Sequence, residues 1–169
     1  MDNVTFPAHQ FVLSARSPVF ARMFQNNMKE NKENSVDITD IKSGVFEVGL
    51  KYIYTGRVSG VETFAYELFS FADKYQLEEL QTRCQEILIQ NLSTLNAFDI
   101  LVLANLHSAK RLRETSIKFI NHCSHKMITS EAWQHFALTH PQLVKELFEK
   151  RSTGRISTKR IKEIKSIRY

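Results

Sequence analysis

The sequence is poor in the residues and segments that mark secreted, fibrous or membrane-spanning proteins. Its 169 residues include two cysteines, five glycines and three prolines. Two cysteines are too few for a disulfide framework, and so little glycine and proline excludes a collagen-like or low-complexity chain. The N-terminus has no apolar signal segment, and no apolar run reaches the roughly 18 to 20 residues that span a bilayer. We therefore expect an intracellular, reduced protein with no membrane contact.

The motifs of common catalytic and metal-binding chemistry are also missing from the sequence. There is no glycine-rich phosphate loop, HExxH, GxSxG or paired-carboxylate arrangement. His122, Cys123 and His125 lie close together, but no second ligand pair follows at zinc spacing, and Cys123 falls on an apolar helix stripe. Cys84 lies on another apolar stripe, where a thiol is usually inert. We expect no enzyme activity, no cofactor and no metal.

Charge is distributed unevenly along the chain. The sequence has 23 Lys and Arg against 18 Asp and Glu, a formal net charge of +5. Eight basic residues and one acidic residue stand in residues 150–169, which leaves 15 basic and 17 acidic residues in 1–149. This mildly acidic body argues against a nucleic-acid-binding face.

The basic tail, residues 150–169, resembles a nuclear-localisation patch at Lys159, Arg160 and Lys162. It predicts a nuclear protein, with the cytoplasm as a second location. The alternatives are electrostatic contact with nucleic acid or an anionic membrane, and a tail that only aids solubility.

The hydrophobic pattern predicts two short strands and several helices. Alternation at Val4 and Phe6, and again over residues 35–38, is typical of strands. Apolar residues at helical spacing predict a helix over 61–75 and further helices to about residue 149. We predict an α+β domain over residues 1–91, an all-helical extension over 92–149 and a solvated tail over 150–169.

Local signals place several helix ends in the first domain. Ser17 followed by Pro18 predicts a helix start, with Ser17 as the N-cap. Asp40 or Ser43 is the predicted cap of the next helix, and Gly56 is its predicted left-handed end. Tyr54, near that end, is expected in the core.

The two predicted strands do not make a complete sheet. Two strands alone are unstable in water, because three or more with a covered face are normally needed. The missing part must come from another chain or from an N-terminal portion of the fold, and we expect aggregation or dependence on a partner chain without it.

The segment AHQFVLSARSPVF, residues 8–20, resembles the AHKxxLAARSPVF signature of the BTB (POZ) domain. Further matches follow in the order of that domain. They are Arg22-Met23-Phe24, Val36-Asp37-Ile38, Tyr52 to Gly56, and Phe71 to Tyr75. The stretches 101–109 and 140–144 are similar to the region after the BTB domain in speckle-type POZ proteins, so the resemblance covers residues 3 to 149.

The resemblance implies a non-catalytic adaptor. In that family the BTB domain homodimerises and binds the N-terminal domain of a type-3 cullin (cullin-3), so that a ubiquitin ligase marks bound targets for proteasomal degradation. The cullin-binding motif maps onto Met28-Lys29-Glu30, with Tyr52 as a further expected contact. A helix pair called the 3-box and a partial BACK domain map onto residues 92–149. The expected partners are that cullin and a second BTB chain, the same or a relative.

The sequence departs from the family pattern at its start. It has no counterpart of the substrate-binding MATH domain, of the dimerisation helix or of the first BTB strand, so we expect a truncated BTB fold, from a fragment, an incorrect gene product or a short paralogue. The alternatives to a cullin adaptor are a self-associating or transcription-associated BTB scaffold and a dominant-negative regulator of full-length relatives. Leu147 and Phe148 are a candidate second self-association surface, or they cap the helical core.

Overall fold

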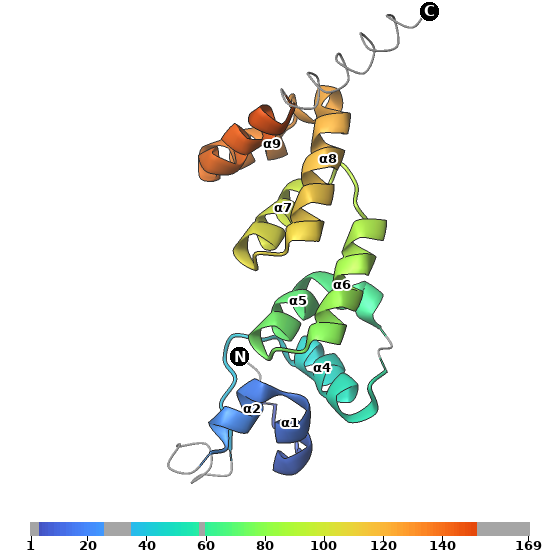
Figure 1. Ribbon diagram of the computed structural model, residues 1–169, viewed down its shortest axis with the longest axis vertical. Coiled ribbons are helices and arrows are strands. Elements are labelled where there is room, and N and C mark those ends of the chain that lie inside the picture. Colours follow the sequence, from blue (N-terminus) through green and yellow to red (C-terminus); the bar gives the residue numbers. More distant parts are fainter. Residues whose placement is uncertain (1–3, 26–34, 58–59, 152–169) are drawn as a thin grey trace, which may run out of the picture. The chain divides into compact units, whose positions relative to one another are not determined.

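The computed structural model describes residues 4–25, 35–57 and 60–151, which form two compact units, Met1–Asn91 and Leu92–Tyr169. We call them unit 1 and unit 2 and describe each by itself. The predicted α+β class is wrong, because the described residues form helices and no strand (Figure 1). None of the helices in these ranges is long and apolar enough to cross a membrane.

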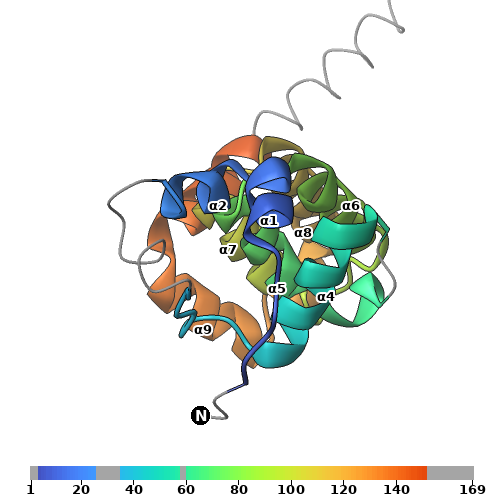
Figure 2. The same cartoon turned by 90° about the horizontal axis from the view of Figure 1, so that it is seen from below.

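The two segments predicted as strands are extended but unpaired. Residues 4–9 and 35–39 lie outside any helix, and Figure 2 shows both as plain extended trace, in dark blue and cyan. A strand is defined by its hydrogen-bonded neighbour, and neither segment has one among the described residues. The prediction of two strands is therefore wrong, because neither segment pairs with a strand among the described residues.

Unit 1 is built from five helices within the described ranges. They are α1 (Gln10–Arg16), α2 (Pro18–Met23), α4 (Ser43–Thr55), α5 (Val61–Lys74) and α6 (Glu78–Gln90). Helix α5 packs against α4 and α6, and α1 packs against α2 and α4. The predicted helix over 61–75 is confirmed, with non-helical backbone angles at Phe64 inside it.

Aromatic rings form the centre of unit 1. Tyr75 is fully buried, and its ring stacks on Phe20 at 4.5 Å between centroids and contacts Phe71 at 4.8 Å. The Ser17 hydroxyl donates to the Tyr75 carbonyl at 2.7 Å and accepts from the Phe20 N–H at 3.2 Å. This one hydroxyl therefore caps α2 and ties it to the end of α5.

The helix-end predictions succeeded in two of three places. Ser17 is the N-cap of α2 with Pro18 in its first turn, and Gly56 ends α4 at φ 65°. The cap predicted for α4 is wrong. Its N-cap is Lys42, and the Asp40 carboxylate instead accepts from the Lys74 ammonium at 2.7 and 2.8 Å.

Unit 2 contains α7 (Ala97–Leu106), α8 (Lys110–Met127), α9 (Glu131–Thr139) and a further helix over residues 141–151. Phe98 stacks on Phe136 at 4.8 Å within a core that draws on all four helices. The Arg113 guanidinium forms a two-pronged ion pair with the Glu146 carboxylate, and its Nη1 lies 2.8 Å from Oε1. This pair fastens the 141–151 helix to α8.

Candidate protein-interaction site

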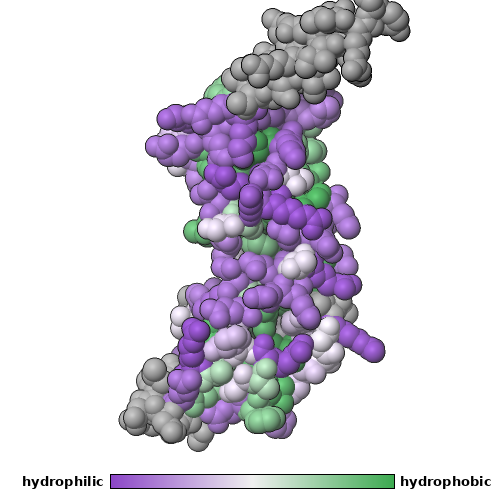
Figure 3. All heavy atoms as spheres, viewed as in Figure 1, coloured by the Kyte–Doolittle hydropathy of each residue, from purple (hydrophilic) through white to green (hydrophobic). Residues whose placement is uncertain are grey.

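An open groove lies between α1 and the C-terminal end of α4. It has a volume of about 330 Å³. Its described lining consists of Phe11, Val12, Ala15, Arg16, Ile53, Tyr54, Thr55 and Gly56. We call this the α1 groove. Figure 3 shows hydrophobic side chains gathered at the surface over α1, near the lower end of the view.

Phe11 gives the α1 groove its apolar character. Its side chain is 84% exposed, while Leu13 on the other face of α1 is buried. Ala15 stands one helical turn after Phe11 and is also exposed. Contiguous exposed apolar surface is a common feature of protein-interaction sites.

The Tyr54 hydroxyl joins the two helices at the rim of the groove. It accepts a hydrogen bond from the His9 backbone N–H at 2.7 Å and lies 2.9 Å from His9 Nδ1. Because a phenol can accept one bond and donate another, it also donates to Nδ1 in the tautomer that leaves this nitrogen unprotonated. The start of α1 is thereby fixed to the end of α4.

Arg16 and Gly56 belong to the lining of the groove. Its guanidinium carbon lies 5.8 Å from the centre of the Tyr52 ring, a cation–π distance. A Cβ atom on Gly56 would lie 3.6 Å from one guanidinium nitrogen, and Gly56 has the positive φ that side chains disfavour. The groove is therefore shaped by one backbone turn and one charged side chain.

Tyr52, which we predicted as a cullin contact, is buried in unit 1. Its residue is 5% exposed, and its hydroxyl donates to Glu79 Oε2 at 3.1 Å. Burial raises the pKa of this phenol, and the hydrogen bond to the Glu79 carboxylate raises it further. Tyr54, which we predicted in the core, is 42% exposed. The prediction for Tyr54 is wrong, because the core lies on the Tyr52 side of α4.

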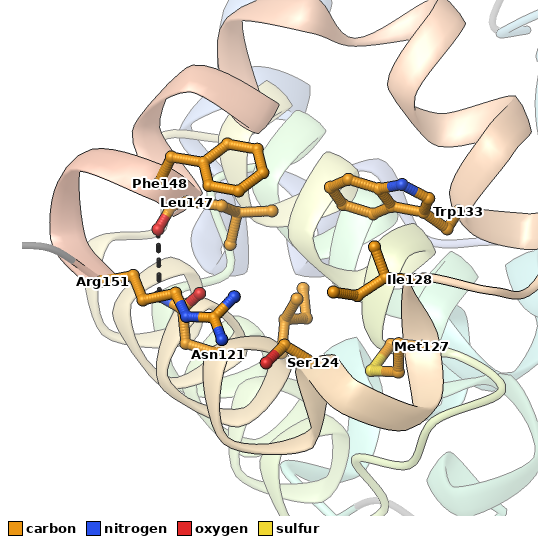
Figure 4. Close-up of a pocket in the computed structure, with 9 residues that line it drawn as sticks. Asn121, Ser124, Met127, Ile128, Trp133, Leu147, Phe148 and Arg151 are labelled. Carbon is orange, nitrogen blue, oxygen red and sulfur yellow. Dashed lines mark hydrogen bonds between the residues drawn. The ribbon is translucent and has the colours of Figure 1, made fainter.

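Leu147 and Phe148 have different surroundings. Leu147 is buried in the core of unit 2, whereas Phe148 is 51% exposed and edge-on to Trp133 at 6.4 Å. Figure 4 shows both around a recess, where the Asn121 side-chain amide donates to the Leu147 carbonyl at 3.2 Å. The recess has a volume of about 20 Å³, room for about one water and no larger ligand.

The remaining predicted sites are outside the described residues or have no ligand geometry. Met28 and Glu30 of the cullin motif lie outside the described residues, as do Lys159, Arg160 and Lys162 of the basic tail. The described residues contain no group of three or more side chains that could hold a metal ion.

Cys84 has the surroundings of a packing residue. It is fully buried, and burial raises the pKa of its thiol to about 12. The thiol is therefore protonated at neutral pH, and the thiolate is the reactive form. Its place on an apolar helix stripe was correctly predicted from spacing.

Sequence reasoning missed Phe11. The signal was present, because Phe11 and Ala15 stand at i and i+4, on the opposite side of the helix from Leu13. The pattern did not indicate a site, because α1 is short and its other face, with Leu13, packs into the core.

The sequence was matched to a known protein family. The family described as "BTB/POZ domain" matches residues 1–92, just over half of the chain. The match covers unit 1 and with it the α1 groove.

Proposed function

The chain belongs to the BTB/POZ domain family, and from this premise we propose that it is a non-catalytic adaptor that recruits a type-3 cullin (cullin-3) to a bound target. A BTB domain is commonly a protein–protein interaction module and a cullin-3 adaptor. The observation that carries the proposal is this family membership together with the hydrophobic-x-Glu motif at Met28-Lys29-Glu30.

The motif is chemically suited to a helical partner. An unbranched thioether side chain such as Met28 adapts to an apolar groove between helices. The Glu30 carboxylate can accept from unpaired N–H groups at the first turn of a partner helix. A hydrophobic anchor beside one charged acceptor is a common composition for the central contact of an interface.

Titration calorimetry with the N-terminal domain of a type-3 cullin tests the adaptor role. We expect saturable binding that weakens at least tenfold in the double variant Met28→Asp, Glu30→Ala. Lys29→Ala, between the two motif positions, is the matched control and should bind like the wild type. No binding by the wild type, or equal binding by the double variant, would exclude this role.

Similarity to the speckle-type branch supports a further part of the proposal. The stretches 101–109 and 140–144 resemble the region after the BTB domain in that branch, and they overlap α7 and the start of the 141–151 helix. We expect deletion of residues 92–151 to weaken cullin binding without abolishing it. Unchanged affinity after the deletion would show that unit 2 does not contribute to cullin binding.

Nuclear location forms the last part of the adaptor proposal. The observation behind it is the basic cluster Lys159, Arg160 and Lys162. A fluorescent fusion of the full chain should move from nucleus to cytoplasm when all three become Ala. If the distribution between nucleus and cytoplasm does not change, these three residues are not a nuclear-localisation signal.

The exposed face of α1 favours a second function, self-association through the α1 groove. Phe11 is 84% exposed beside Val12 and Ala15. Exposure of an apolar side chain as large as phenylalanine to water is unfavourable in free energy. A second copy that covers the groove would remove this surface from water on both chains, as in an isologous dimer.

Light scattering after size-exclusion chromatography tests self-association. The wild type should have the mass of a dimer, and Phe11→Asp should shift it to the monomer. Leu138→Asp is the matched control, because Leu138 is equally exposed at 84% but lies in unit 2. A monomeric wild type, or a mass that Phe11→Asp leaves unchanged, would contradict the proposal.

A further inference from the structure

Positive charge is concentrated on helix α8 of unit 2. The helix contains five Lys and Arg residues and one acidic residue, Glu114. The net charge of the whole chain hides this difference, because unit 2 has 14 basic and 6 acidic residues while unit 1 has 9 and 12. Six of the 14 basic residues stand after residue 151. Helix α8 therefore has the largest group of positive charges among the described residues of unit 2.

Three polar side chains form a row on the exposed side of α8. Leu112 and Ile120 are buried, and α8 packs against α7, which lies with α9 on one side of it in Figure 1. Lys118, His122 and Lys126 are exposed. They stand at i, i+4 and i+8, so they follow one another along the helix on the side that the core does not use. We call these three residues the α8 row.

The lysines of the α8 row are not neutralised by the described part of the chain. The ion pairs within the described residues of unit 2 involve other cations, namely Arg113, Lys145 and Lys150. Glu114 stands one turn before Lys118, but no ion pair joins these two described side chains. The row can therefore bind carboxylates from another molecule. One exposed ion pair contributes little, so a partner must engage several members of the row at once.

The spacing of the α8 row fits an extended chain. Four residues of α-helix rise about 6 Å, and two residues of an extended segment advance about 6.6 Å. Acidic side chains at every second position of such a segment point to the same side and therefore lie opposite successive members of the row. All three members can donate hydrogen bonds, because a neutral imidazole still has one N–H group.

We propose that the α8 row binds an extended acidic segment of another protein, with Asp or Glu at every second position. The ammonium groups of Lys118 and Lys126 bind the outer two carboxylates, and the His122 ring donates to the one between them. The row lies apart in sequence from the cullin motif and from the α1 groove. The inference therefore goes beyond the function proposed above and does not depend on it.

A nucleic acid fits this face less well. Strongly salt-dependent nucleic-acid complexes use on the order of six to ten phosphate contacts, whereas the α8 row has three members. Single strands are also held by stacking of bases on exposed aromatic rings. Phe119 is the one Phe, Tyr or Trp residue of α8, and it packs against the core of unit 2.

A second copy of this chain does not offer such a segment within its described residues. The extended segments 4–9 and 35–39 contain one acidic residue, Asp37. Most other acidic residues described in unit 1 stand on helices, for example Glu62 on α5 and Glu78 on α6. The partner is therefore a different polypeptide.

Two synthetic peptides test the spacing directly. Both are fluorescein-labelled nonapeptides of three Glu and six Ser, with Glu at every second position in one and at every third position in the other. Anisotropy with the full chain at physiological ionic strength should show saturable binding of the first peptide. The second should bind at least fivefold more weakly. The absence of saturable binding of the first peptide, or equal affinity of the two, would overturn the proposal.

A charge reversal locates the bound peptide. The double variant Lys118→Glu, Lys126→Glu should weaken binding of the first peptide at least tenfold. The matched control is Lys165→Glu, Arg168→Glu, which changes the net charge of the chain by the same amount and should weaken binding less than twofold. Equal losses in the two variants would overturn the proposal, because affinity would then follow net charge and not the α8 row.

A fold check accompanies the charge reversal. Both substituted positions on α8 are exposed, so the urea midpoint from Trp133 fluorescence should not change. If it does change, Lys118→Gln with Lys126→Gln removes the charges without adding new ones, and this variant should still weaken binding at least threefold. Wild-type affinity in the glutamine variant would overturn the proposal.

Two further measurements decide the class of the partner. A fluorescein-labelled oligothymidylate should bind the wild type and the α8 double variant equally. A larger loss for the oligonucleotide than for the peptide would identify a nucleic acid as the occupant. The type-3 cullin domain should bind equally well with and without saturating peptide, and its displacement would assign the row to the cullin surface. Either of these contrary results would make the proposed partner wrong.

Discussion

Unit 1 and unit 2 differ in how completely they bury their own surface. Unit 1 has a groove of about 750 Å³ bordered by extended main chain, whereas the recess beside Phe148 in unit 2 measures about 20 Å³. Helices satisfy most of their backbone groups within one segment, and an extended segment needs a neighbour. The difference shows that the helices of unit 2 enclose their core closely, while the extended segments of unit 1 border an open groove.

The largest expected effect comes from creating a cavity in the core of unit 2. Phe98 is 6% exposed and contacts both Phe136 and Trp133. Phe98→Ala should lower the free energy of unfolding of unit 2 by about 3–5 kcal/mol, because it removes a buried ring and leaves a cavity.

Urea titration followed by Trp133 fluorescence measures this loss, since Trp133 is the one tryptophan of the chain and lies in unit 2. Leu138→Ala, at an exposed position, should change it by less than about 0.5 kcal/mol. Equal effects of the two substitutions would show that unit 2 is not the closed core described above.

The ion pair that fastens the last helix of unit 2 should have the next largest effect. The side chains of Arg113 and Glu146 are 30% and 18% exposed, so the pair is partly shielded from water. Arg113→Met should cost about 1.5–3 kcal/mol, as expected for charged hydrogen bonds.

The same fluorescence titration measures the loss. The exposed pair of Lys145 and Glu149 provides the control, because Lys145→Met should cost no more than about 0.5 kcal/mol. If the control loses as much stability as Arg113→Met, burial of the pair has no energetic role.

A substitution in unit 1 should lower the stability of unit 1 without changing that of unit 2. A Cβ atom on Gly49 would overlap the ring of Phe71, which is buried. Gly49→Ala should cost about 1–3 kcal/mol through overpacking, of which the helix propensity of alanine recovers at most about 1 kcal/mol.

Circular dichroism and Trp133 fluorescence, recorded together, check whether only unit 1 is affected. Gly44→Ala is the control, since its Cβ would make an ordinary 3.6 Å contact with Phe64. A shift of the fluorescence transition as large as that of the dichroism would show that the units unfold as one.

The smallest effect is a pH dependence in unit 1. The hydrogen bond from Lys74 holds the pKa of Asp40 below its usual value of 3.8. A carboxyl with a lowered folded-state pKa stabilises the fold at neutral pH, and this contribution is lost as the pH falls through the folded-state value, below about 4. Both side chains are exposed, so the loss should stay under about 1 kcal/mol.

Urea midpoints of the wild type and Asp40→Asn, compared at neutral and acidic pH, measure this contribution. The difference between the two proteins should be largest at neutral pH and should shrink in acid. If the difference in urea midpoint does not change with pH, the Asp40–Lys74 pair is not its cause.

The parts of the fold that could be predicted from the sequence are those set by neighbouring residues. The cap at Ser17 and the left-handed end at Gly56 depend on two or three residues, and both predictions were confirmed. The strands predicted around Val4 and Phe6 and over residues 35–38 were wrong, because side-chain alternation shows which face is covered and not whether a neighbouring strand exists.

The candidate site shows the same limit. Tyr52 and Tyr54 stand two positions apart on one helix, so spacing separates them but does not tell which side the core occupies. Phe11 became visible as a site residue only when the structure placed it beside the end of α4. Long-range packing decides these points, and a single sequence contains no direct record of it.

The double role of the Ser17 hydroxyl has a consequence for folding order. It accepts from Phe20, three residues away, and donates to the carbonyl of Tyr75, 58 residues away. The second bond closes a long loop, and such contacts form late because the chain must first lose the entropy of that loop. The final stability of helix α2 therefore depends on α5, because one bond of its capping hydroxyl exists only when the end of α5 is in place.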